Sequence, residues 1–254
     1  MNLDVHGARI LLEIPVDVPV LGRIIITETV VNTWIVMAVI VSLCLFLTHG
    51  MQVHCRTKRQ IIAEFIVKKV NGMVGENMGE HFLEVGYGPL IAAIMGLSAL
   101  CSLSSMVGMY APTSDLSTLL GWSLMVFVLI TWNKFRAGGI IGYFKGYFQP
   151  IPVLLPFNII SEFATPLSMA FRHFGNIASG SVITGLIYAA LASLSAAIFH
   201  LLPGALGEVM SGVPLFQVGI PAIFSIYFDL FSSCLQAFIF CMLTMMYIGS
   251  AAEG

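Results

Sequence analysis

Two apolar stretches in the second half of the sequence are too long to cross a membrane as straight helices perpendicular to its plane. Residues 151–202 and 214–248 are almost unbroken runs of apolar side chains. As a helix, the second stretch alone would be about 50 Å long, because an α-helix rises about 1.5 Å per residue. The hydrocarbon core of a bilayer is only about 30 Å thick. The sequence therefore predicts two long helices that tilt steeply in the membrane or break inside it.

The composition indicates a membrane location for the whole chain. Of the 254 residues, 58% are hydrophobic and only 9% are charged, whereas a soluble domain carries about 25% charged residues. The formal net charge of −2 gives no reason to expect a nucleic acid as a partner. The five cysteines include no CxxC pair, so neither a disulfide framework nor a metal site is indicated. We expect an integral membrane protein without a cofactor.

Windows of about 20 apolar residues mark further membrane spans earlier in the chain. They cover residues 30–48, 87–110 and 116–132. Between the first two spans, residues 55–76 are polar but carry apolar side chains at helical spacing, which is typical of a helix on the membrane surface. The expected fold is therefore all-α, with five membrane-embedded helices and one surface helix. It forms a single membrane domain, 1–254, that starts with an external N-terminal segment, 1–29.

The basic residues predict how the chain is oriented. Lys134, Arg136 and Lys145 follow the third span, and the surface helix is also rich in Lys and Arg. Positive charge marks the cytoplasmic side of a membrane protein. The link "APTSDLS" before the third span and the join "PGALGEVMSGVP" between the long helices contain no Lys or Arg, so we expect both outside. This arrangement places the N-terminus outside and the C-terminus in the cytoplasm.

Each long helix carries its polar residues on one side. In the first helix they recur every three or four positions, as Asn158, Ser161, Glu162, Thr165, Ser168, Arg172, Asn176 and Ser179. In the second helix similar spacing holds for Ser225, Asp229, Ser232, Ser233 and Gln236. Residues at this spacing share one face of a helix. Two otherwise apolar helices thus each present a polar stripe that contains ionisable side chains.

The stripes have two explanations. Ser and Thr side chains hydrogen-bond between membrane helices, and this packing role accounts for Ser161, Thr165, Ser168, Ser225 and Ser232. Glu162, Arg172 and Asp229 are different, because a charge in the centre of a membrane helix costs from about 3 to more than 10 kcal/mol. Such a residue is placed where it faces water or a partner. These three residues are the leading candidates for a functional site.

The motif "PFNIISEFATPLSMAFRHFGNIASG", followed by "LQAFIFCMLTMMYIG", resembles the closing third of subunit a of F-type ATP synthases. A looser resemblance extends back through "PTSDLS" and covers nearly the whole chain. That subunit is the non-catalytic membrane stator beside the rotating ring of c subunits. The resemblance implies a multi-pass protein of a bacterial cell membrane that contacts lipid, the c-ring and the peripheral-stalk b subunits. It also implies two half-channels that pass protons to and from the ring.

The resemblance assigns roles to individual residues. It implies that Arg172 faces the carboxylates of the c-ring, that Asn176 is its neighbour one turn on, and that Gln236 meets it from the last helix. Glu162 matches an acidic position that lines the cytoplasmic access path. Ser233 shares the polar side of the last helix with Gln236 and is expected to line the ion path there.

Two positions depart from the commonest pattern of that family. Ser181 stands where many members have Glu, and Asp229 stands where members often have His or Glu. The acidic group has therefore moved to the facing helix, and we expect Ser181 and Asp229 to face one external path.

Two other functions remain open from the residues alone. A self-contained secondary transporter would use Glu162, Arg172 and Asp229 to bind an anionic substrate, but it would be expected to show paired repeats and broken helices, and no repeat is visible. A purely structural assembly subunit would leave the charges unexplained. The sequence also does not decide between H⁺ and Na⁺ as the transported ion.

Overall fold

The computed structural model describes residues 7–18, 21–53, 57–148, 151–200, 224 and 226–253. The α-helices are α1 (Glu28–Thr48), α2 (Lys58–Met78), α3 (His81–Val85), α4 (Tyr87–Leu103), α5 (Leu116–Gly146), α6 (Leu155–His200) and α9 (Ser233–Glu253). Three short 3₁₀ turns lie between helices: η1 (Ser104–Val107), η2 (Pro112–Ser114) and η3 (Pro152–Leu154). A π-helix, η5 (Ile226–Ser232), runs directly into α9. Two antiparallel strands, β1 (Ile10–Val18) and β2 (Leu21–Thr27), precede α1.

Five helical segments of the described chain are long and apolar enough to cross a membrane. They are Glu28–Thr48, Tyr87–Val107, Leu116–Gly146, Pro152–Ser195 and Ile226–Ala252. The predicted all-α membrane fold is thereby confirmed. α2 is too polar to span, and it exposes one apolar face while its other face packs on the bundle.

The buried core lies where α2, α4 and α9 meet. Val74 of α2, Ile91 of α4 and Ile248 of α9 have no exposed surface. Val126 of α5 and Met169 of α6 belong to the same cluster of buried side chains. The helices therefore pack on one shared core, and the apolar side chains on their outer faces are left to contact lipid.

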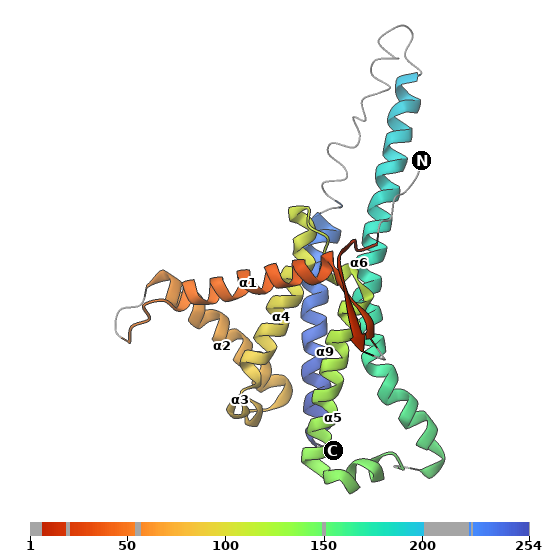
Figure 1. The fold of residues 1–254 in the computed structure, drawn as a ribbon. Helices are drawn as coiled ribbons and strands as arrows, with labels where there is room; N and C mark the ends of the chain where they lie inside the picture. The colour runs from red at the N-terminus through yellow and green to blue at the C-terminus, as the bar shows by residue number, and fades with distance from the viewer. Residues whose placement is uncertain are drawn as a thin grey trace.

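The length of α6 requires a strong inclination in a membrane. It spans 46 residues, or about 69 Å of helix at about 1.5 Å per residue, against a hydrocarbon thickness of about 30 Å. The helices α4, α5 and α9 run alongside α6, whereas α1 runs across this bundle (Figure 1). α1 and the bundle therefore cannot both be perpendicular to the membrane. Because α6 is much longer than the hydrocarbon core is thick, the bundle is the part that is inclined.

The third span is longer than expected. α5 continues to Gly146 rather than ending near residue 132, and its backbone leaves helical geometry at Gly139, where φ is 66°. Glycine adopts positive φ at little cost because it has no Cβ. The chain therefore bends at this residue, and the end of α5 turns toward the start of α6 (Figure 1).

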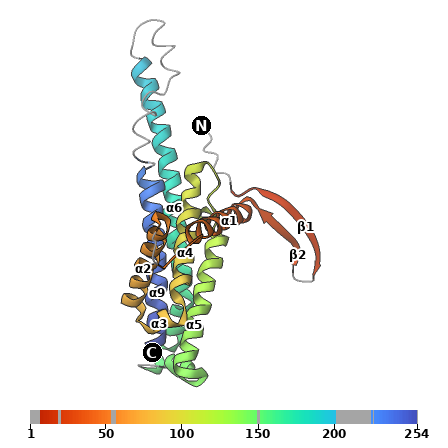
Figure 2. The same cartoon turned by 90° about the vertical axis from the view of Figure 1, so that its left-hand side faces the viewer.

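The N-terminal segment contains structure that the sequence did not lead us to expect. β1 and β2 form a hairpin that projects from the side of the helices (Figure 2). Glu13 lies opposite Ile25 in this hairpin and forms an ion pair with Arg23 at 3.2 Å. Several expected segments lie partly or wholly outside the described residues. They are the join between the two long helices, 203–214, residues 201–202 of the first long helix, residues 215–223 and 225 of the second, and positions 55 and 56 of the expected surface helix.

Close packing between α9 and α2 generates a prediction. A Cβ added at the buried Gly249 would lie 3.2 Å from the carbonyl oxygen of Asn77 and 3.4 Å from Cα of Met78. Backbone atoms cannot move aside as a flexible side chain can, so Gly249→Ala should destabilise the fold by about 1–3 kcal/mol. We expect a thermal unfolding midpoint in detergent that is lower by a few degrees. Gly121→Ala is the matched control, because its Cβ would meet nothing within 4 Å; equal midpoints for the two variants would contradict this packing.

Candidate functional site

Arg172 lies on the open side of α6. Its neighbours Met169, Ala170 and His173 are buried, so they define the packed side of the helix. The His173 ring meets the ring of Phe240 on α9 edge to face, with centroids 5.8 Å apart. The side chain of Arg172 is exposed, and within the described chain no hydrogen bond or ion pair joins it to another residue.

An unpaired guanidinium in an apolar helix has a physical consequence. Arg remains protonated at any working pH and offers five N–H donors. Leaving it in hydrocarbon would cost from about 3 to more than 10 kcal/mol, depending on how far it reaches water. The exposed face of α6 at Arg172 therefore needs water or an anionic partner against it.

Asn176, one turn after Arg172, connects α6 to the π-helix η5. Its side-chain amide donates to Oγ of Ser232 at 2.7 Å, and that hydroxyl donates back to Oδ1 of Asn176, with the oxygens 3.1 Å apart. One turn further along α6, a Cβ at Gly180 would lie 3.5 Å from the ring of Phe228. The two helices therefore run antiparallel in close contact, with Asn176 beside Ser232 and Gly180 beside Phe228.

This register locates the two positions that the sequence singled out as a displaced pair. The backbone of Asp229 belongs to η5, next to Phe228, and therefore lies alongside the turn of α6 that contains Gly180 and Ser181. Ser181 is exposed, and its hydroxyl donates to the carbonyl oxygen of Ala178 at 2.9 Å. π-Helical turns are rare and are frequently found at functional sites. Ser225, another member of the predicted stripe, lies outside the described residues.

Ser233 and Gln236 begin α9 with buried side chains, each 5% exposed. They lie on the side of α9 that packs into the bundle, close in sequence to Ser232 and its bond to Asn176. In the part of the chain that the structure describes, no hydrogen bond joins Gln236 to Arg172. The expected meeting of these two residues therefore stays a prediction.

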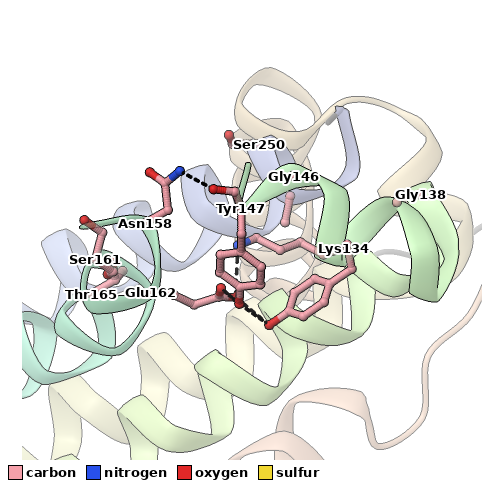
Figure 3. Close-up of a pocket in the computed structure, with 12 residues that line it drawn as sticks. Lys134, Gly138, Gly146, Tyr147, Asn158, Ser161, Glu162, Thr165 and Ser250 are labelled. Atoms are coloured by element: carbon pink, nitrogen blue, oxygen red, sulfur yellow. Dashed lines mark hydrogen bonds and ion pairs between the residues drawn. The ribbon is translucent and has the colours of Figure 1, made fainter. Parts of the chain in front are cut away.

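Glu162, ten residues before Arg172, is held by two side chains of α5 and by that of the residue directly after α5 (Figure 3). Nζ of Lys134 donates to Oε1 of Glu162 at 3.0 Å. The hydroxyl of Tyr143 donates to the same oxygen at 3.1 Å, and the hydroxyl of Tyr147 donates to Oε2. Both carboxylate oxygens are therefore hydrogen-bonded. The Glu162 side chain is only 6% exposed, whereas that of Lys134 is 37% exposed.

Tyr147 is held as a hydrogen-bond donor. Burial and the bond to Glu162 raise the pKa of its hydroxyl above the ordinary value, so the proton stays on the phenol at physiological pH. The backbone carbonyl of Tyr147 accepts a hydrogen bond from the side-chain amide of Asn158 at 2.9 Å, which ties this residue to the first turn of α6.

Two cavities meet at the Lys134–Glu162 pair. The larger has a volume of about 380 Å³ and extends toward the α5–α6 turn, between Gly146, Tyr147 and Asn158. The smaller, about 190 Å³, extends the other way between α5, α6 and α9. Both cavities have Lys134, Glu162, Thr165, Ser250 and Ala251 in their walls.

Sequence reasoning found Glu162 but missed the residues that hold it. Lys134 was used there only as a sign of orientation. Tyr143 and Tyr147 are one helical turn apart in a segment rich in glycine, and that spacing places them on one face. The pattern could have indicated a shared contact, but it could not have named Glu162 as its target.

Comparison with known proteins finds matches over most of the chain. Residues 30–249 match the family described as ATP synthase A chain. The chain is 31% identical over 237 residues to "ATP synthase subunit a, sodium ion specific" of Propionigenium modestum, covering 88% of this chain and 73% of that protein. It is 34% identical over 202 residues to ATP synthase subunit a of Bacillus pumilus, covering 76% of this chain and 78% of that protein. The chain is also 28% identical to ATP synthase subunit a of Moorella thermoacetica, over 94% of this chain and 97% of that protein.

The match to the family covers all five membrane-spanning helices except the first two residues of α1 and the last residues of α9. It includes Glu162, Arg172, Asp229 and Gln236 within one continuous alignment range. The chain belongs to the ATP synthase A chain family.

Proposed function

We propose that this protein is the non-catalytic stator subunit in the membrane sector of an F-type ATP synthase. In this role it forms two half-channels, one open to each side of the membrane, that pass protons to and from a rotating c-ring. The observation that carries the proposal is Arg172, an exposed guanidinium without a partner in the described chain. The exposed guanidinium needs water or an anionic partner from outside the chain, and the carboxylates of a c-ring have the right charge to be that partner.

Arg172 acts as both an attractor and a barrier in this mechanism. At about 4 Å and an effective dielectric constant near 20, it attracts an ionised carboxylate by about 4 kcal/mol. A ring carboxyl that arrives opposite Arg172 therefore gives up its proton there. The permanent positive charge also keeps protons from passing directly between the two half-channels.

The external half-channel is assigned to the contact between α6 and η5. Asp229 takes up protons from outside, and Ser181 faces the same path from α6. Asn176, Ser233 and Gln236 line its inner end near Arg172. The proposal is supported by the hydrogen bonds between Asn176 and Ser232, which hold the two helices at this register.

The cytoplasmic half-channel is assigned to the cavities beside Glu162. It is supported by their position at the end of the bundle that carries Lys134, Arg136 and Lys145, because positive charge marks the cytoplasmic side. The N-terminus then lies outside and the C-terminus in the cytoplasm of a bacterial cell. Peripheral-stalk b subunits and lipid cover the remaining outer faces.

We expect Arg172→Ala to abolish proton-coupled ATP synthesis while leaving the complex assembled. Arg172→Lys should also fail, because an ammonium is a point charge that loses its proton more readily when desolvated. ATP synthesis in membrane vesicles, together with co-purification of the c-ring, measures both points. An assembled Arg172→Ala complex that makes ATP at a near-normal rate would remove Arg172 from the mechanism.

A second prediction concerns Asp229, which carries the acidic group that many family members have at the position of Ser181. Asp229→Asn should reduce ATP-driven proton pumping severely, because an amide does not bind and release a proton near neutral pH. Ser181→Ala alone should cost little, since water can replace a hydroxyl in a wet path. Combining Asp229→Asn with Ser181→Glu returns a carboxylate to the opposite wall and should restore part of the pumping.

The double variant decides whether the two positions share a path. If it assembles but pumps no better than Asp229→Asn alone, Asp229 acts through another contact. The same vesicles identify the ion, which matters because one relative is named for sodium ions. Pumping that requires added Na⁺ would replace H⁺ in this mechanism and leave the stator role intact.

A further inference from the structure

We propose that the Lys134–Glu162 ion pair is a gate in the cytoplasmic half-channel, and that Lys134 is the residue that closes it. This inference rests on the proposed function for the direction of the path. It assigns a role to the end of α5, which contributes no residue to the family motif quoted above. Tyr143 and Tyr147 act as positioning residues that hold the Glu162 carboxylate in place.

Two cavities lie beside the Lys134–Glu162 pair. The Lys134–Glu162 pair is part of the wall of both cavities, one of about 380 Å³ and one of about 190 Å³. The smaller one also reaches Pro166, which is one turn of α6 nearer to Arg172 than Glu162 is. A proton that moves from the Arg172 region to the end of α5 along this route therefore passes the ion pair.

The two partners of the ion pair differ in how deeply they are buried. Glu162 is fixed, because it is almost fully enclosed and accepts bonds on both oxygens. Lys134 is more than a third exposed at the end of a flexible stem. Its Nζ also lies 5.9 Å from the centroid of the Tyr143 ring, an aromatic face that can receive the ammonium when the pair separates. Lys134 is therefore the partner that can move.

The charges around Glu162 explain what opens the gate. The titratable groups that face it are Lys134, Tyr143 and Tyr147 at the end of α5, and Tyr247 of α9 in the wall of the smaller cavity. A proton that reaches the Glu162 carboxylate neutralises it, so the attraction to Lys134 is lost and the ammonium moves away. When Glu162 gives this proton to water in the larger cavity, the carboxylate is charged again and the pair re-forms.

The test is the pH dependence of ATP-driven proton pumping by the whole complex in inverted membrane vesicles, with the pH varied on the cytoplasmic face. Lys134→Met removes the cation that faces the buried carboxylate. The alkaline limb of the pumping profile should therefore shift upward, because a nearby cation disfavours the neutral form of a carboxyl group. Lys134→Arg keeps the cation and should leave the limb in place. Lys145→Met is the matched control, because Lys145 is exposed near the end of the same helix and does not line either cavity.

A double variant shows whether the two residues act as a pair. Glu162→Gln should slow pumping, and adding Lys134→Met to it should cause no further shift of the alkaline limb. Two results would contradict the gate. One is an equal shift of the alkaline limb by Lys134→Met in the chain with Glu162 and in the Glu162→Gln variant. The other is no shift of the limb by Lys134→Met when Glu162 is present. If Lys134→Met does not assemble with the c-ring, Tyr147→Phe decides instead, because it removes one donor from Glu162 and should shift the limb in the same direction.

Failure of the gate can be distinguished from failure of the proposed function. If Arg172→Ala stops transport while Lys134→Met leaves the pH profile unchanged, the results support the stator role and contradict the gate. If the assembled Arg172→Ala complex still pumps, the proposed function falls, whatever Lys134→Met does.

Discussion

A charged side chain has few stable positions in an apolar medium, because leaving water costs several kcal/mol unless a counter-charge or hydrogen-bond donors replace the water. α6 contains two different solutions to this constraint. Glu162 is enclosed, and Lys134, Tyr143 and Tyr147 supply its partners. Arg172 is exposed and has no partner within the described chain, so water or another chain must supply one. This difference between two charges on one helix underlies the proposed ion path beside Glu162 and the proposed docking face at Arg172.

The bend at Gly139 makes the enclosed site possible. The backbone leaves helical geometry at Gly139, where φ is 66°, and Tyr143 and Tyr147, which follow this residue, both donate to Glu162. Only glycine adopts such a conformation at little cost. Lys134 precedes the bend and the two tyrosines follow it, so donors from both parts of the segment reach the carboxylate.

Close contact between α6 and the last helical segment has a comparable origin. Gly180 leaves room for the ring of Phe228, and Asn176 exchanges hydrogen bonds with Ser232. The backbone in this part of the second helix is π-helical, which widens the turn that contains Asp229 relative to an α-helix. Small side chains and an amide–hydroxyl pair thus bring two very apolar helices together at the level where the predicted ion-path residues lie.

Composition and periodicity were enough to predict the membrane class, the number of spanning helices and the position of the polar stripes, because both are properties of neighbouring residues. The sequence also contained the motif around Arg172 that led to the family. It did not predict the β1–β2 hairpin or the full length of α5. The contacts of Lys134 with Glu162 and of Asn176 with Ser232 became visible only in the folded chain. These partners are 28 and 56 residues apart, and their contacts depend on a backbone bend and a helix register that no local pattern contains.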